Sequence, residues 1–168
     1  LADWKLGETR VHLHHDVPKR PCLRLESGHE YFCDPLGRSL ELVIAGAGHI
    51  ARPLSQMAQI CGYRVKVIDD RPEYARSEFF PQAQVDCADF AEYFSRLEVG
   101  AGSHIVLITR GHKYDEVCLR ALKDRNPDYL GMIGSRRRTR AVLDELRQEG
   151  CSPQWLKRIY APVGLDIG

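Results

Sequence analysis

The fold of this chain is decided by the stretch Leu42-Val43-Ile44-Ala45-Gly46-Ala47-Gly48-His49-Ile50-Ala51. An apolar run typical of a strand leads into the pattern Gly-x-Gly-x-x-Ala, which opens a segment with helical periodicity. Gly46 permits a tight turn, Gly48 lets the backbone approach a pyrophosphate, and Ala51 allows the helix to pack closely on the sheet. The start of such a helix offers free N–H groups and a partial positive charge to an anion. The stretch therefore predicts a dinucleotide-binding turn between a strand and a helix.

An acidic residue at the expected distance supports this interpretation. The next apolar run ends at Asp69 and Asp70, and Asp69 stands 23 residues after Gly46. An acid at this place in a dinucleotide-binding fold hydrogen-bonds a ribose hydroxyl. The alternative, that the glycines serve packing alone, stays open. Pro53 fits the predicted helix only within its first turn, because a proline further along would remove a hydrogen bond.

Outward from this stretch, apolar runs alternate with helical segments. Runs typical of buried strands cover residues 40–45, 64–68, 84–87, 104–109 and 129–134. Apolar residues with helical spacing follow four of these runs, and the first such stripe consists of Ile50, Leu54, Met57, Ala58 and Cys61. The last long helix is predicted to begin after Ser135 as its cap and to end at Gly150. The alternation predicts an α/β fold with a Rossmann-like, doubly wound parallel sheet of about five strands.

Residues 1–38 are more polar and are interrupted by prolines. Residues 22–26 and 29–33 alternate around Ser27-Gly28, which predicts a β-hairpin. We predict a small β-rich N-terminal appendage over residues 1–38, interpreted as the end of a truncated N-terminal domain, and a Rossmann-like domain over residues 39–168. His12 and His14 share one face of a predicted strand, which we interpret as a solvated face rather than a metal site.

The composition is that of a globular protein with a hydrophobic core. The 168 residues carry a formal net charge of +1, and 43% of them are hydrophobic. This balance gives no reason to expect nucleic acid as a partner, and no apolar run approaches the ~18 residues that cross a membrane. The six cysteines form no Cys-x-x-Cys pair. We expect a cytoplasmic protein with reduced, mostly buried cysteines, Cys61 and Cys118 among them.

Two further segments predict anion-binding groups. In an open α/β sheet, ligands bind beyond the carboxyl ends of the strands at the switch point. Arg110 and His112 follow the fourth run and should therefore meet the glycine loop in one crevice, with Ser135 and Arg136 at its edge. Arginines 136, 137, 138 and 140 crowd the start of a helix, where the macrodipole disfavours cations. A phosphate bound there would reverse this effect, and a solvated basic face is the alternative.

Five segments in order resemble the C-terminal Rossmann-like domain of the xanthine dehydrogenase accessory (XdhC/CoxI-type) family. They are residues 46–54, 67–73, 109–112, 131–137 and 161–168, and the resemblance extends over about residues 40–168. It implies a maturation factor that binds molybdenum cofactor (molybdopterin), supports exchange of an oxo for a sulfido ligand, and delivers the cofactor to the apo-enzyme of a molybdenum hydroxylase. It also implies a cysteine desulfurase as sulfur donor. Most of the family's N-terminal domain and its last helix are absent, and we expect a piece of a longer protein.

The resemblance implies cofactor binding rather than catalysis, and no catalytic residue is predicted. By hypothesis the glycine loop and Arg110 hold the phosphate portion of the cofactor, while His112 and Asp166 hydrogen-bond the pterin. The predicted cofactor-binding residues are Gly46, Gly48, His49, Ala51, Asp69, Arg110, His112, Ser135, Arg136 and Asp166.

Two alternatives stay open. One is an NAD(P)-dependent oxidoreductase or nucleotide-sensing module, because the glycine loop and Asp69 fit NAD equally well and Arg71 leaves NADP open. The other is an interaction scaffold without a ligand. The sequence also leaves the oligomeric state open, with a homodimer as one option.

Overall fold

The computed structural model describes residues 2–5, 8–11, 22–26, 29–33 and 40–165, and the chain divides into two compact units, residues 1–38 and 39–168. In the first unit, β1 (Ala2–Lys5) pairs antiparallel with β2 (Glu8–Val11). Strands β3 (Cys22–Glu26) and β4 (His29–Cys33) also pair antiparallel, which confirms the predicted hairpin. His12 and His14 lie outside the described residues.

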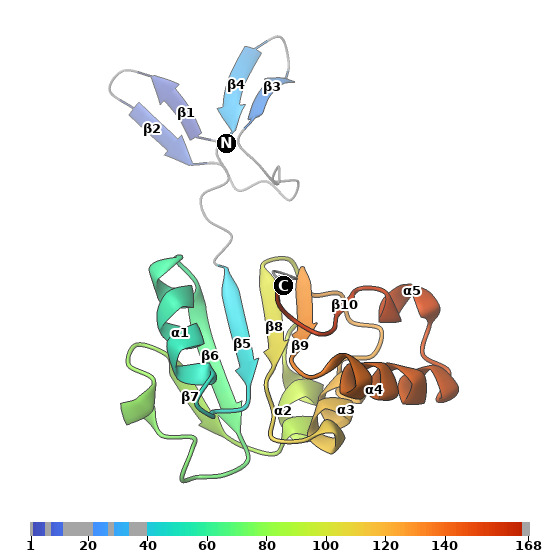
Figure 1. Ribbon diagram of the computed structural model, residues 1–168. Coiled ribbons are helices and arrows are strands. Elements are labelled where there is room, and N and C mark those ends of the chain that lie inside the picture. Colours follow the sequence, from blue (N-terminus) through green and yellow to red (C-terminus); the bar gives the residue numbers. More distant parts are fainter. Residues whose placement is uncertain (1, 6–7, 12–21, 27–28, 34–39, 166–168) are drawn as a thin grey trace. The chain divides into compact units, whose positions relative to one another are not determined.

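The second unit is built on a six-stranded parallel sheet with the order β10-β9-β8-β5-β6-β7 (Figure 1). Its strands are β5 (Glu41–Ala45), β6 (Arg64–Asp69), β7 (Gln84–Cys87), β8 (Ser103–Leu107), β9 (Tyr129–Met132) and β10 (Ile159–Tyr160). Numbered within this unit, the order is 3-2-1-4-5-6, the strand order of the Rossmann fold. The predicted fold class is confirmed. The sixth strand was not predicted, because two residues give no alternation to recognise.

Helices cover both faces of this sheet. Helix α1 (Ala51–Ile60) and the 3-10 turn η1 (Ser77–Phe79) lie on one face. Helices α2 (Phe90–Arg96), α3 (His112–Ala121), α4 (Arg136–Gln148) and α5 (Pro153–Leu156) lie on the other. Strand β5 serves both cores, since Leu42 and Ile44 pack with α1 while Val43 and Ala45 pack with α2 to α4. No helix in the part of the chain described here is long and apolar enough to cross a membrane.

Helix α1 buries a face that overlaps only in part with the predicted one. Its buried residues are Ala51, Ser55 and Ala58, whereas Met57 is 57% exposed. Ile50 and Cys61 of the predicted stripe are also exposed, whereas Ala58 is buried and Leu54 is half-buried against the same core, so only part of the stripe packs. The fully buried positions of α1 carry small side chains, which allow the helix to lie close to the sheet. Pro53 is the third residue of α1, within the first turn, as the sequence requires.

The cysteines divide between the core and the surface. Cys118 and Cys151 are buried free thiols, and burial raises the pKa of Cys118 well above its usual range. Cys61 and Cys87 are free but exposed. The expectation of a buried Cys61 is therefore wrong, because Cys61 follows the end of α1, beyond the buried face of that helix.

Candidate functional site

The glycine loop lies at the carboxyl end of β5, between β6 and β8. The N–H of Gly46 donates to the carbonyl of Ile68 at 2.7 Å, and a Cβ on Gly46 would lie 2.5 Å from the carbonyl oxygen of Ile108. The backbone at Gly46 has a φ of +109°, so both its conformation and its surroundings require glycine. A Cβ on Gly48 would instead meet nothing within 4 Å. This half of the loop therefore has free space beside the backbone.

The loop presents N–H groups on its open side. Among the described residues, none accepts a hydrogen bond from the N–H groups of Gly48, His49 or Ile50. The side chain of His49 is exposed, and Ala51 is fully buried where α1 begins against the sheet. Free N–H groups at the start of a ten-residue helix form an arrangement suited to phosphate oxygens.

Asp69 holds the glycine loop in place. Its carboxylate accepts hydrogen bonds from the N–H of Ala47 at 2.8 Å and from the guanidinium of Arg71 at 2.8 and 3.0 Å. Asp69 is 1% exposed, and Arg71 lies 3.7 Å above the ring of Tyr74. Arg71 is thus engaged by Asp69 and Tyr74, and the more accessible acid at the end of β6 is Asp70.

Asp70 and Arg110 form an ion pair across the switch point. Nη2 of Arg110 donates to Oδ2 of Asp70 at 2.8 Å, and Nη1 donates to Oδ1, so the pair is bidentate. The guanidinium also lies 3.8 Å above the ring of Tyr114 and donates to its hydroxyl. The hydrogen bond from Arg110 holds the pKa of Asp70 below its usual range. The structure therefore places Arg110 with its charge already paired to Asp70, which follows the strand on the other side of β5. The predicted shared crevice with the glycine loop stays a prediction.

A buried carboxylate that the sequence did not single out organises the loop after β8. Asp115 is fully buried in α3 and is hydrogen-bonded to the hydroxyl of Thr109 at 2.6 Å and to the guanidinium of Arg138. Burial raises the pKa of Asp115, while the bonds from Thr109 and Arg138 oppose the shift. The sequence signal that could have revealed Asp115 is a charged residue on the face of α3 that packs against the core. The network joins the loop that carries Arg110 to the first turn of α4.

The remaining predicted residues lie around this network. Ser135 caps α4 and accepts a hydrogen bond from the N–H of Arg138 at 3.2 Å, which confirms the predicted cap. Arg136 begins α4, the helix that follows β9, and its side chain is exposed. His112 begins α3 next to Arg110, and its side chain is exposed. Asp166 lies outside the described residues, so its predicted role stays a prediction.

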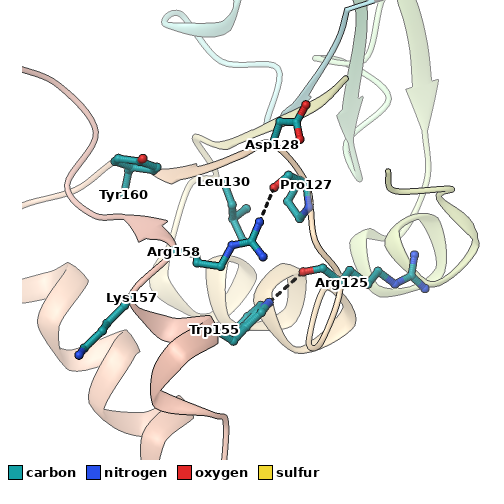
Figure 2. Close-up of a pocket in the computed structure, with 8 residues that line it drawn as sticks. All are labelled: Arg125, Pro127, Asp128, Leu130, Trp155, Lys157, Arg158 and Tyr160. Atoms are coloured by element: carbon teal, nitrogen blue, oxygen red, sulfur yellow. Dashed lines mark hydrogen bonds between the residues drawn. The ribbon is translucent and has the colours of Figure 1, made fainter. Parts of the chain in front are cut away.

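Two cavities lie away from the switch point. One has a volume of about 190 Å³ and is lined by Arg125, Pro127, Asp128, Leu130, Trp155, Lys157, Arg158 and Tyr160. Figure 2 shows that the charged ends of Arg125 and Lys157 point away from its centre, while Arg158 donates to the carbonyl of Pro127. The other, of about 660 Å³, opens at the amino ends of β5, β6 and β8. Neither cavity includes a residue of the glycine loop.

Within the described ranges, no group of three or more His, Cys, Asp or Glu side chains is placed to hold a metal ion. N–H, hydroxyl and guanidinium groups that can bind an anion are found at the switch point, where the glycine loop, Thr109 and Arg110 follow adjacent strands.

Comparison with known proteins agrees with this geometry. The sequence model of the XdhC Rossmann domain matches residues 42–168. A Bacillus subtilis protein, named as a probable subunit of xanthine dehydrogenase, is 33% identical over 128 residues, covering 76% of this chain and 37% of that protein. The Escherichia coli K12 protein YqeB, described as uncharacterized, is 29% identical over 134 residues, or 79% of this chain and 24% of its own length.

A solved structure has the same fold. The crystal structure of a xanthine dehydrogenase from Bacillus halodurans aligns with a TM-score of 0.69 and 27% identity, covering 82% of this chain and 40% of the other. The chain thus spans well under half the length of each of these relatives.

Proposed function

The chain belongs to the family of XdhC Rossmann domains, and on that premise we propose that it serves the maturation of a molybdenum hydroxylase such as xanthine dehydrogenase. Its task is to bind molybdenum cofactor as cargo at the glycine loop. The names of the Bacillus subtilis relative and of the Bacillus halodurans structure, both of which refer to xanthine dehydrogenase, support this assignment. The observation that carries it is the open space beside Gly48 at the switch point of a Rossmann sheet.

The residues present fit the anionic part of such a cargo. The N–H groups of the loop and the start of α1, for which no acceptor is found in the part of the chain that the structure describes, favour a phosphate, and Gly48 leaves room for it to reach the backbone. Arg110 adds a guanidinium that suits phosphate oxygens. His112 and Asp166 are assigned to the pterin, whose amino-pyrimidinone edge matches a carboxylate. In this proposal the chain binds, orients and shields its cargo and does not itself catalyse the exchange of ligands on molybdenum.

Two protein partners follow from this role. The apo-enzyme of a molybdenum hydroxylase receives the cofactor, and a cysteine desulfurase supplies the sulfur for the sulfido ligand. Because this chain spans only part of the length of its relatives, both partners are proposed for the longer proteins that contain this domain.

The decisive experiment measures retained cofactor on purified protein. The chain is produced in cells that make molybdenum cofactor, and bound molybdenum and oxidised pterin fluorescence are quantified. Gly48→Leu fills the free space and should abolish retention without changing the fold, as judged by circular dichroism. Gly100→Leu is the matched control, because a Cβ there also meets nothing within 4 Å and Gly100 precedes the amino end of β8. Equal pterin content in wild type and Gly48→Leu contradicts the assignment.

A nicotinamide nucleotide is the second candidate ligand. The strand order 3-2-1-4-5-6 favours it, since dinucleotide-binding domains share that order. The engagement of Arg71 with Asp69 and Tyr74 favours NAD over NADP within this alternative, because the guanidinium of Arg71 is then not free for a 2′-phosphate. A fluorescence titration with NADH separates the candidates: micromolar affinity supports the nucleotide module, and no binding supports the cofactor carrier.

A further inference from the structure

The feature that the proposed function leaves unexplained is the ion pair between Asp70 and Arg110. Asp70 follows β6 and Arg110 follows β8, and these strands are the two neighbours of β5 in the sheet. A contact between residues 40 positions apart therefore passes across the end of the strand that carries the glycine loop. We propose that Asp70 competes with the phosphate of the ligand for Arg110. The ion pair between Asp70 and Arg110, the Asp70–Arg110 strap, opens when a phosphate binds Arg110 in place of Asp70. This inference rests on the proposed function.

The two acid–arginine pairs after β6 differ in how easily they can open. Asp69 is 1% exposed, and besides Arg71 it holds the N–H of Ala47, so a movement of its carboxylate would release the glycine loop. Asp70 and Arg110 have side chains that are 26% and 32% exposed, and water can replace either partner. Ion pairs at such positions contribute little net free energy. The Asp69 pair therefore has a structural role, whereas the strap can exchange partners.

The surroundings of Arg110 keep it ready for this exchange. Its guanidinium lies 3.8 Å above the ring of Tyr114, an interaction that does not depend on Asp70. A phosphate with two negative charges offers more acceptor oxygens than the carboxylate it displaces. A ligand without an anionic group provides no negatively charged acceptor for Arg110, so the Asp70–Arg110 ion pair stays formed. Asp70 thus limits the affinity of the site for phosphate, because a phosphate has to displace Asp70 from Arg110 before it can bind there.

The test uses inorganic pyrophosphate as the probe and the full chain as the protein. Isothermal titration calorimetry compares wild type with Asp70→Asn, Asp70→Glu, Arg110→Gln and the Asp70→Asn/Arg110→Gln double variant. Asp70→Asn frees Arg110 and should tighten binding about threefold to tenfold, whereas Arg110→Gln should weaken it about tenfold. Asp70→Glu keeps the charge and should restore affinity close to that of wild type.

Two controls separate the strap from simpler explanations. Glu149→Gln neutralises another exposed carboxylate that is paired with an arginine, Arg120, at the far end of α4, and it should leave pyrophosphate affinity unchanged. In the Arg110→Gln background, Asp70→Asn should change affinity by about twofold or less, because the competitor has lost its target. An equal gain in both backgrounds means that Asp70 acts by charge repulsion alone, and this overturns the strap.

The remaining outcomes are also decisive. Unchanged affinity in Asp70→Asn overturns the strap while leaving the proposed cofactor site intact. Absence of pyrophosphate binding in every variant overturns the strap together with the phosphate assignment of the glycine loop. Cofactor retention measured on the Gly48→Leu and Gly100→Leu pair then decides the proposed function separately.

Discussion

At the scale of single residues, Gly46 and Gly48 belong to one loop but are glycine for different reasons. The carbonyl of Ile108 and a positive φ exclude any side chain at Gly46, whereas Gly48 has free space and no unusual φ. The first glycine is thus needed by the fold, and the second is available to a ligand. The pattern Gly-x-Gly-x-x-Ala does not separate these two needs, because both are satisfied by the same residue type.

The stability of two glycine variants should separate steric overlap from backbone strain. Gly46→Ala should lower the free energy of unfolding by about 3 kcal/mol, since backbone atoms of Ile108 cannot move aside easily. Gly150→Ala, at a φ of +83° with nothing within 4 Å, should cost only about 1 kcal/mol. Urea denaturation monitored by the fluorescence of buried Trp155 measures both values. Equal losses would show that the contact with Ile108 has no effect.

The ionisation of Asp70 should report directly on its pairing. Its pKa is lowered from the ordinary 3.8 mainly by the hydrogen bond from Arg110. Such a carboxyl adds stability above its ordinary pKa, and this contribution is lost as the pH falls through the lowered value. In Arg110→Gln the pKa should rise back toward 3.8, as followed by carbon-13 NMR of the side-chain carboxyl. Glu149, whose pKa Arg120 lowers, is the internal reference and should not change. An unmoved Asp70 pKa would contradict the pairing.

At the scale of secondary-structure elements, the strands could be predicted and one helix face could not. Four of the six parallel strands, β5, β6, β8 and β9, carry apolar runs that are largely buried, so their positions are evident in the sequence. The weaker run of β7 is exposed or half-buried at the edge of the sheet. In helix α1, Ala58 of the predicted apolar stripe is buried, but Ile50 and Met57 are exposed and the small residue Ala51, outside the stripe, is buried instead. The distance between the helix and the sheet is set by tertiary packing, and the periodicity of apolar residues in the sequence does not predict it.

The candidate site shows the same division. The glycine loop and Arg110 were predicted, because a motif and the switch-point rule place them at the ends of adjacent strands. The partners of Asp69 and the role of Asp115 were not, because each depends on side chains that meet only after folding. In the sequence, Asp115 cannot be told from a solvent-exposed acidic residue of a helix. In the structure it is buried and hydrogen-bonded to Thr109 and Arg138.

Asp115 should be the residue that ties α3 to α4. Asp115→Ala removes the partner of Thr109 and Arg138 and should lower the free energy of unfolding by about 2 kcal/mol. Glu116→Ala is the matched control on the next residue, since Glu116 pairs with Arg120 at the surface and should cost about 0.5 kcal/mol or less. Chemical denaturation gives both numbers. A cost for Asp115→Ala as small as that for Glu116→Ala would contradict a linking role.

At the scale of the whole molecule, the chain consists of two units with separate architectures. Residues 1–38 contain two antiparallel strand pairs, and residues 39–168 contain the parallel sheet and its helices. Both described core clusters draw their buried residues from Leu42 to Ile159. All the described groups of the candidate site come from the same unit. The binding proposal therefore needs the second unit to be a stable domain in its own right.

Residues 39–168 should accordingly fold alone. The first residues of this unit are already anchored within it, since Leu40 accepts a hydrogen bond from Arg64 and Glu41 donates one to Gly102. The isolated domain should unfold in one cooperative transition with a midpoint within about 3 °C of the full chain, measured by circular dichroism and fluorescence of Trp155. A shorter piece beginning at residue 47 should not fold, because it lacks β5, which pairs with both β6 and β8. A midpoint about 8 °C lower or more for residues 39–168 would mean that the first 38 residues contribute to the core, and the site would then have to be studied only in the full chain.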